Sequence, residues 1–241
     1  MMIYRFLPEE FALQVLQTGM WKVGRLFGLN DPADFQPRLI CEPPRSNAGA
    51  DADEAFAQIF LRHLHENLGV VCLSSAIRDP AVWGHYADDH RGMALGFDFT
   101  PNGIRLHEVR YQEERATISY QETEALSSDG KPHAEFIERV ITSGFTSKAP
   151  SWRYEQEFRI FVPFVRPHCQ MIGSHYFQHI GAPNRVVLGL RCKTPESDIC
   201  RLGQARGLNF AQITTARMDP VNHSLHVSFP IHVQPSAVAP P

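Results

Sequence analysis

The sequence predicts an α+β domain with a mostly antiparallel, possibly split, central sheet and flanking helices. Strand and helix patterns mix along the chain without the regular strand–helix–strand spacing of a parallel sheet, and no internal repeat is present. The chain has 241 residues, of which 43% are apolar and 20% charged, enough apolar material for a packed core. A mainly disordered chain is therefore excluded. We expect one domain over residues 1–233 and a frayed Pro/Ala-rich tail over 234–241.

The first third of the chain alternates strand and helix patterns. Pro8 and the two glutamates after it favour a helix start, because proline and acidic residues suit the first turn, and Gly19 ends that helix. A loop rich in Pro, Ser, Asn and Gly is expected over 36–53, and helical apolar spacing follows over 53–67. The expected strands of this part run over 2–7, 25–29 and 70–75.

The rest of the chain contains the strongest strand pattern. Asp79-Pro80 caps a short helix, and Arg91-Gly92 ends it. In the segment 157–164 the apolar residues Phe158, Ile160 and Val162 share one face of a strand. Further strands are expected over 93–99, 106–112, 176–180, 185–190 and near 210–217, and helices over 131–147 and near 196–206.

The charge balance and the cysteines restrict the classes of function. The net charge of −3 comes from 23 basic and 26 acidic residues without a block of one sign, so a basic duplex-binding surface is not expected, although a local groove for one strand stays open. No apolar stretch is long enough to cross a bilayer and no secretory leader opens the chain, so we expect a cytoplasmic protein. The five cysteines form no Cys-x-x-Cys pair and indicate reduced thiols.

Several common catalytic motifs are missing. The sequence has no glycine-rich dinucleotide or P-loop phosphate motif, no Gly-x-Ser-x-Gly and no His-Glu-x-x-His. One class of nuclease has a Glu-x-Lys motif on a strand. The nearest match in this sequence is Glu155-Gln156-Glu157, which lacks the lysine at the third position. This departure weakens the nuclease interpretation.

The segment 152–159 is the most informative in the chain. Glu155, Glu157 and Arg159 alternate, so in an extended strand they share one face while Phe158 and Ile160 enter the core. Two carboxylates on one face repel each other, and Arg159 can relieve that repulsion. The pattern is compatible with a solvent-exposed face of mixed charge. It is equally compatible with a paired-carboxylate site, in which one carboxylate aligns a substrate and the other assists bond cleavage.

A second cluster spans residues 83–90. On a helix His85 and Asp89 are four residues apart and could share a metal ion, but no third ligand is identifiable. The favoured interpretation places Trp83 and Tyr86 toward the core, while the polar residues cap the helix or line a pocket.

Two further segments contain candidate binding residues. Tyr4-Arg5 lies in the first expected strand, where the arginine is either a surface residue or a planar anion-binding group suited to a pyrophosphate. Ser74 and Ser75 end the strand over 70–75, and their hydroxyls either terminate that strand or orient a ribose or a carboxylate.

These segments together resemble the bacterial family catalogued as domain of unknown function 2971. The residues that carry the resemblance are Tyr4-Arg5, Asn30-Asp31-Pro32-Ala33-Asp34, Cys72-Leu73-Ser74, Trp83 to Gly92, Gly96-Phe97-Asp98, and Lys148 through Trp152, Tyr154, Glu155, Glu157 and Arg159. The likeness extends over roughly residues 3–190, and Ala33 stands where the family often has phenylalanine. The family has no established activity.

A more distant resemblance concerns function. An arginine on the first strand, a serine ending a middle strand and Glu-x-Glu opening a later strand are similar to the layout of Arg-Ser-Glu ADP-ribosyltransferases. The resemblance implies that Arg5 binds the NAD pyrophosphate, that Ser74 steadies the site, that Glu157 binds the ribose 2′-hydroxyl and that Glu155 activates the acceptor.

The same resemblance implies an ADP-ribosyltransferase-like fold and further contacts with NAD. Tyr4 and Arg159 are expected to contribute to binding NAD, Tyr86 or Trp83 would stack on nicotinamide, and His85 would bind phosphate or acceptor. Breaking the nicotinamide–ribose bond builds positive charge on the sugar, which a fixed carboxylate stabilises without a metal.

Three functional hypotheses follow. The first is an NAD-consuming ADP-ribosyltransferase-like transferase, associated with a toxin–antitoxin or phage-defence system and acting on a protein or nucleic-acid acceptor. The second is a metal-dependent nuclease or hydrolase that uses Glu155, Glu157, Asp89 and His85. The third is a non-catalytic module that binds a nucleotide or a partner.

Overall fold

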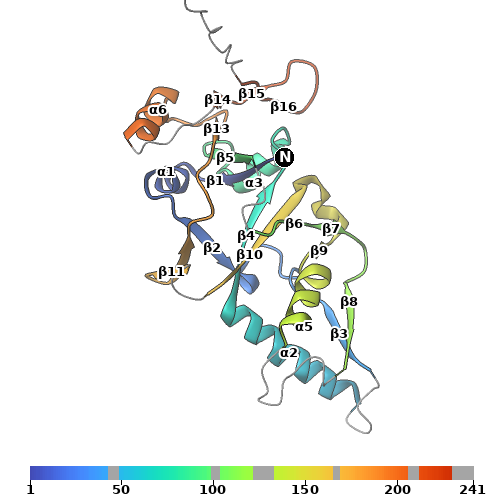
Figure 1. Ribbon diagram of the computed structural model, residues 1–241. Coiled ribbons are helices and arrows are strands. Elements are labelled where there is room, and N and C mark those ends of the chain that lie inside the picture. The colour runs from blue at the N-terminus through green and yellow to red at the C-terminus, as the bar shows by residue number, and fades with distance from the viewer. Residues whose placement is uncertain (43–48, 99–103, 122–132, 165–168, 206–211, 230–241) are drawn as a thin grey trace, which may run out of the picture. The chain divides into compact units, whose positions relative to one another are not determined.

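The structure is a computed structural model that describes residues 1–42, 49–98, 104–121, 133–164, 169–205 and 212–229 (Figure 1). The chain divides into two compact units. Unit 1 comprises Met1, Gly19–Ala76 and Phe99–Gly181, and unit 2 comprises Met2–Thr18, Ile77–Asp98 and Ala182–Pro241. The tail predicted over 234–241 lies outside the described residues.

Unit 1 contains an antiparallel sheet. Its strands pair in the order β11-β12-β2-β4-β10-β6. Their bounds are Cys169–Ile172 (β11), His175–Gln178 (β12), Trp21–Arg25 (β2), Leu68–Ser74 (β4), Glu157–Pro163 (β10) and His107–Glu108 (β6). The centre of this sheet is the long pairing of β4 with β10, which brings the two ends that carry Ser74 and Glu157 together.

Two short parallel pairs accompany this sheet. They join β3 (Arg38–Cys41) to β8 (Thr117–Tyr120) and β7 (Arg110–Tyr111) to β9 (Ser147–Lys148). The second pair matters for the site because it places Lys148 beside Tyr111.

The helices of unit 1 pack on an apolar core. Helix α2 (Gly49–Asn67) leads directly into β4 and lies beside α5 (Ala134–Arg139), as Figure 1 shows. The rings of Phe60 and Phe136 connect the two helices with a centroid separation of 4.8 Å. Phe56, Phe60 and Leu64 recur every four residues on α2 and are buried, as expected of a helix that presents one apolar face.

Unit 2 contains a second part of the sheet. Its strands pair in the order β1-β5-β13-β14, with bounds Met2–Leu7 (β1), Met93–Asp98 (β5), Arg185–Leu188 (β13) and Gln212–Thr215 (β14). Only β13 and β14 are parallel among these pairs of described strands. A short antiparallel pair joins β15 (Arg217–Met218) to β16 (Leu225–His226).

The described residues of unit 2 include the helices α1 (Glu9–Thr18), α3 (Pro80–Tyr86) and α6 (Glu196–Ala205). The Asp79 side chain accepts a hydrogen bond from the Ala81 N–H, and Pro80 follows it, so α3 begins as its sequence predicts. After α3, residues Asp88, Asp89 and His90 all have positive φ angles. His85 and Asp89 therefore do not share a helix, and the expected four-residue helical spacing of a metal pair is wrong.

The α+β class with a mostly antiparallel sheet is confirmed, but several element boundaries differ from the prediction. The expected strand over 25–29 is the end of β2 followed by a 3-10 turn over Leu26–Gly28. The expected loop over 36–53 contains β3 and the start of α2. The expected helix over 131–147 is α5 followed by a π-helical turn over Val140–Gly144. The turn over Leu26–Gly28 and strand β3 are short segments, and the state of such segments depends on partners distant in sequence.

Among the described residues, none of the helices has both the length and the apolar character that crossing a membrane requires.

Candidate functional site

A cluster of buried charged side chains lies in unit 1, and we call it the ionic cluster. Its members are Asp34, Lys148, Glu155, Glu157 and Arg159. Each of the five is at most 7% exposed. The interpretation of Glu155, Glu157 and Arg159 as a solvent-exposed strand face is therefore wrong, because β10 is an inner strand of its sheet and is buried on both faces.

The two glutamates reach the cluster from different elements. Glu157 is the first residue of β10, whereas Glu155 ends the 3-10 helix Pro150–Glu155. Between them Gln156 has a φ angle of 44°, in the left-handed region. The expected strand alternation therefore holds only from Glu157 onward, and a turn brings Glu155 toward the same cluster.

Ser74, the last residue of β4, and Ser75 after it hold this turn in place. Ser74 is the register partner of Glu157, and its hydroxyl donates a hydrogen bond to the backbone carbonyl of Glu155. The Ser75 N–H donates to the Gln156 carbonyl at 3.2 Å, and its hydroxyl bonds the Gln156 side chain at 2.9 Å. These hydrogen bonds offset the conformational free energy that the left-handed backbone of Gln156 costs, and they fix the backbone on both sides of Gln156.

Arg159 connects Glu157 to Asp34. Its Nε and Nη2 donate to the two oxygens of Glu157 at 2.8 and 2.9 Å. Its Nη1 and Nη2 donate to the two oxygens of Asp34 at 3.0 and 2.6 Å. The guanidinium is completely buried and lies over the Phe35 ring at 4.5 Å. This planar fork binds each of two carboxylates through two hydrogen bonds, a bidentate geometry that the ammonium of a lysine does not offer.

Lys148 connects Glu155 to Glu157. Its Nζ lies 2.5 Å from Glu155 Oε2 and 3.1 Å from Glu157 Oε2. It also lies 3.9 Å from Asp34 Oδ2 and 4.7 Å from the centre of the Trp152 ring. The buried ammonium is therefore surrounded by carboxylates and an aromatic face, the groups that stabilise a desolvated cation.

The pKa values in the cluster reflect a balance between burial and pairing. Burial raises the pKa of Glu157, but the charges and hydrogen bonds of Arg159, together with Lys148, outweigh burial and lower it to about 2. Burial also dominates at Asp34, whose pKa stays raised despite Arg159. The pKa of Lys148 is raised, because its carboxylate partners outweigh the effect of burial. Lys148 and Glu157 are therefore both ionised at neutral pH.

Two neutral groups complete the surroundings of Glu157. The Tyr111 hydroxyl accepts a hydrogen bond from the Glu157 N–H at 2.8 Å, and burial raises the pKa of Tyr111 to about 12. Burial and the charge of Glu157 raise the pKa of the Cys72 thiol well above its ordinary value. Cys72 is therefore protonated and a poor nucleophile.

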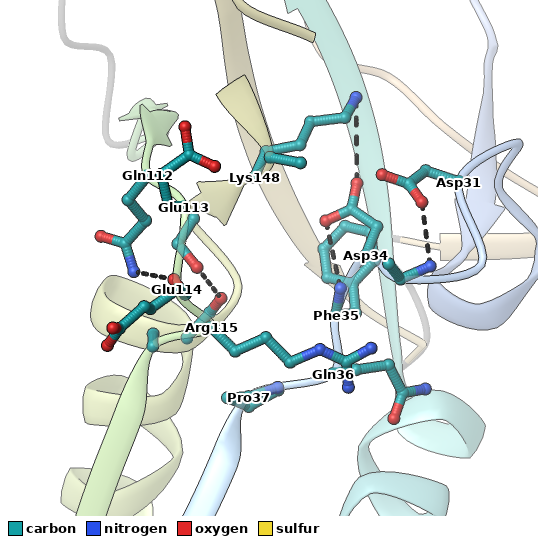
Figure 2. A pocket seen from close by; sticks show the side chains of 15 residues that line it. Asp31, Asp34, Phe35, Gln36, Pro37, Gln112, Glu113, Glu114, Arg115 and Lys148 are labelled. Atoms are coloured by element: carbon teal, nitrogen blue, oxygen red, sulfur yellow. Dashed lines mark hydrogen bonds and ion pairs between the residues drawn. The ribbon is translucent and has the colours of Figure 1, made fainter. Parts of the chain in front are cut away.

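A pocket in the same unit adjoins the cluster (Figure 2). It has a volume of about 170 Å³. Its lining comes from the segments 31–37, 112–116 and 147–149 together with Gly144. Asp34 and Lys148 belong both to this lining and to the ionic cluster, so the pocket wall and the carboxylate network share side chains.

The remaining predicted site residues belong to unit 2. Tyr4 and Arg5 are on β1, where Tyr4 is buried and Arg5 half-buried. Burial is the main cause of a raised pKa at Tyr4. His85 is exposed and Tyr86 half-buried, at the end of α3. Ser74, Glu155, Glu157 and Arg159 are the predicted site residues that unit 1 brings together.

Trp83 packs as a core residue of unit 2. Its exposed fraction is 0%, its Nε1 donates to the Ile77 carbonyl at 2.8 Å, and its ring packs edge-on against Phe6. This agrees with the interpretation that places Trp83 toward the core. The stacking of Trp83 on nicotinamide would need a ring face that is not exposed.

The part of the chain that the structure describes contains no group of three His, Cys, Asp or Glu side chains arranged to hold a metal ion. Of the proposed metal ligands, Glu155 and Glu157 belong to unit 1, and His85 and Asp89 belong to unit 2.

The sequence argument missed two members of the cluster as site residues. The family pattern could have pointed to Asp34 and Lys148, because it includes an aspartate after Asn-Asp-Pro and a lysine before the tryptophan. Asp34 lies far from the Glu-x-Glu segment in the sequence, and Lys148 lies in another element. Their contacts with the cluster therefore depend on the tertiary structure.

The comparisons with known proteins support the family resemblance. The sequence model of a family described as "Protein of unknown function (DUF2971)" matches residues 82–160. This range includes the segment from Trp83 to Gly92 and the cluster residues Lys148, Glu155, Glu157 and Arg159, whereas Asp34 and Ser74 precede it. No curated protein and no solved structure matches the chain.

Proposed function

We propose that this protein is an NAD-consuming ADP-ribosyltransferase-like enzyme. Its residues 82–160 match the sequence model of the DUF2971 family, whose function is unknown. One observation carries the proposal: Ser74 at the end of β4 is the register partner of Glu157 at the start of β10, with Glu155 two residues earlier. The Arg-Ser-Glu resemblance requires a serine and a Glu-x-Glu pair to meet in this way. An ADP-ribosyltransferase-like fold of the sheet is part of the same proposal.

The proposed reaction needs a carboxylate beside the sugar. The bond between the nicotinamide nitrogen and ribose C1′ breaks, and its electron pair leaves with neutral nicotinamide. Positive charge then develops on C1′ and the ring oxygen, and a fixed carboxylate stabilises it. An oxygen or nitrogen of the acceptor forms the new bond to C1′, and its proton passes to the carboxylate. When water is the acceptor, the product is free ADP-ribose.

The geometry favours different tasks for the two glutamates. Glu157 accepts hydrogen bonds on both oxygens, from Arg159 and from Lys148. Because these bonds occupy most of its lone pairs, we assign to Glu157 the task of holding the network. We assign the contact with the reacting ribose and with the acceptor proton to Glu155, whose backbone the Ser74 hydroxyl fixes.

The other roles that the resemblance implies remain predictions. In these predictions Arg5 binds the pyrophosphate and Tyr4 contributes to binding NAD. His85 and Tyr86 contact nicotinamide, phosphate or the acceptor. The argument from Ser74, Glu155 and Glu157 uses residues of unit 1 alone and does not depend on them. A protein or nucleic-acid acceptor and a toxin or phage-defence setting are likewise part of the proposal.

The test is the release of nicotinamide from NAD, measured together with the transfer of labelled ADP-ribose to protein or nucleic acid. We expect Glu155→Gln to lower the rate by at least about a hundredfold, because the neutral amide neither stabilises the cationic sugar nor accepts the proton. Equal rates in the wild type and this variant, or no release by the wild type, would overturn the proposal.

A matched control separates loss of chemistry from loss of fold. Glu108 is an exposed glutamate on β6, the strand next to β10. Glu108→Gln removes one carboxylate from the same region outside the cluster, and we expect it to keep the wild-type rate. Near-UV circular dichroism of both variants checks that the core is intact.

A metal-dependent nuclease or hydrolase is the second candidate, and one observation favours it. The lysine that the sequence lacks two residues after Glu155 is supplied in space by Lys148, which contacts both glutamates. This candidate predicts cleavage of a nucleic acid or ester that needs a divalent cation and stops with a chelator. Nicotinamide release that is indifferent to the chelator favours the first proposal.

A further inference from the structure

We propose that Lys148 is a positioning residue for the carboxylate pair, which holds Glu155 and Glu157 next to each other so that Glu155 can act on the substrate. The inference rests on the proposed function of these glutamates and extends it to a residue to which the ADP-ribosyltransferase resemblance assigns no role. Its role is indirect, because Lys148 acts through the two carboxylates and not on the reacting atoms.

The first support is the position of the ammonium. Lys148 Nζ bridges Oε2 of Glu155 at 2.5 Å and Oε2 of Glu157 at 3.1 Å. These oxygens come from two different elements, a 3-10 helix and a strand, separated by the left-handed Gln156. One cation thus connects the side chains of residues whose backbones do not form a continuous strand.

The second support is the rigidity of the lysine itself. Lys148 is on β9, and its carbonyl accepts a hydrogen bond from the Gln112 N–H at 3.0 Å. Its side chain is 4% exposed, and the Trp152 ring lies 4.7 Å from Nζ. A lysine whose backbone is hydrogen-bonded and whose side chain is buried loses little additional freedom when it binds the carboxylates.

The third support is electrostatic. Two carboxylates close together in a poorly solvated site do not both ionise unless a cation lies between them. Arg159 pairs with Glu157 and Asp34 through its fork, whereas Lys148 contacts Glu155 as well as Glu157. Removing the ammonium therefore leaves the pair with a repulsion that protonation or movement of one carboxylate must relieve. Either response disables a carboxylate that must be ionised and correctly placed.

The fourth support is the adjoining pocket. Figure 2 shows the Lys148 side chain reaching from the wall of the pocket toward Asp34, with an ion pair of 3.9 Å between them. The residue that joins the two glutamates therefore also lines a cavity in the same unit. A change at Lys148 alters the carboxylates and the wall of this cavity together.

The experiment compares Lys148→Met and Lys148→Gln with the wild type in nicotinamide release from NAD between pH 5 and 9. Methionine keeps much of the buried apolar stem of the lysine, and glutamine keeps a hydrogen-bond donor, but both remove the charge. We expect kcat to fall by at least about tenfold while KM changes less than about threefold. We also expect the acidic limb of the pH–rate profile to move upward by about one pH unit or more.

Lys148→Arg is the conservative variant, and it should keep the acidic limb near its wild-type position because the positive charge remains. Lys22→Met is the matched control, because Lys22 is an exposed lysine on β2; we expect wild-type kcat and pH profile. Wild-type kcat and an unmoved acidic limb in a folded Lys148→Met or Lys148→Gln protein would overturn the inference.

A second measurement does not depend on activity. The carboxyl carbon of Glu157 is titrated by carbon-13 NMR in the wild type and in the folded neutral variant, with Lys22→Met as control. We expect the pKa of Glu157 to be higher in the variant, because Lys148 is one of the cations that lower it. An unchanged titration would refute the electrostatic role of Lys148. A wild-type protein that releases no nicotinamide would refute the proposed function, and this titration would still test the lysine.

Discussion

Arg159 and Asp34 bind each other through two hydrogen bonds of 2.6 and 3.0 Å, although 125 residues separate them in the chain. The contact fastens the turn that contains Asp34 to strand β10, and the Arg159 Nη1 also donates to the Phe145 carbonyl at 2.6 Å. One buried guanidinium thus connects three segments of unit 1. The ionic cluster is consequently a structural centre of this unit as well as a candidate site.

Replacing Arg159 by methionine should therefore be severely destabilising. The variant keeps much of the apolar stem but leaves the carboxylates of Asp34 and Glu157 buried without their main cation. We expect the free energy of unfolding to fall by about 3–5 kcal/mol, measured by urea denaturation at pH 7. Arg91→Met is the control, since Arg91 forms an exposed pair with Asp88, and it should change stability little. A small effect of Arg159→Met would contradict the central role of this residue.

The stability that Glu157 contributes should depend on pH in the acid range. Its pKa is about 2 in the folded protein, below the ordinary value of 4.5, so between these values the unfolded chain binds more protons. The contribution is fully present above about pH 4.5 and is lost as the pH falls toward 2. The difference in unfolding free energy between the wild type and Glu157→Gln should therefore shrink over this range by on the order of 3 kcal/mol.

Urea denaturation between pH 2.5 and 7 measures this difference. The contribution of Asp34 to the unfolding free energy changes with pH in the opposite direction, because its raised pKa makes the folded protein bind more protons as the pH falls. Asp34 therefore opposes part of the stability loss caused by Glu157. Glu108→Gln, which removes an exposed carboxylate, should differ from the wild type by a nearly constant amount. A difference for Glu157→Gln that stays constant from pH 5 to 2.5 would refute the assignment.

Ser74→Ala should loosen the turn before β10. The substitution removes the donor to the Glu155 carbonyl and the acceptor of the Ala76 N–H, so buried backbone groups lose partners. We expect a loss of about 1–3 kcal/mol in unfolding free energy and a lower rate of nicotinamide release. Ser119→Ala, which removes an exposed hydroxyl bonded to Glu42, is the control for both measurements and should leave them close to wild type.

Two glycines of the segment matched to the family should respond oppositely to alanine. A Cβ at Gly92 would lie 2.0 Å from the Leu7 carbonyl oxygen, a backbone atom that cannot move aside easily. A Cβ at Gly84, inside α3, would meet nothing within 4 Å. We expect Gly92→Ala to lower the melting temperature strongly and Gly84→Ala to leave it unchanged or raise it. Equal melting temperatures would show that the turn at Gly92 adapts.

Local patterns in the sequence determined several of the elements and one part of the site. The cap at Asp79, the period-two apolar residues of β10 and the four-residue spacing on α2 depend on neighbours within a few positions, so they can be predicted from the chain alone. The family pattern is also a property of the sequence, and it is confirmed over residues 82–160. The candidate carboxylates Glu155 and Glu157 were found for the same reason.

Only the tertiary structure decided what surrounds those carboxylates. Lys148 and Asp34 come from other elements and are brought to Glu155 and Glu157 by the pairing of β7 with β9 and by the Arg159 fork. Whether a charged strand residue faces water or a buried partner depends on the strands and rings on both sides of it, as the complete burial of Arg159 illustrates. Such partners are set by contacts between distant segments, and a pattern along one segment contains no information about them.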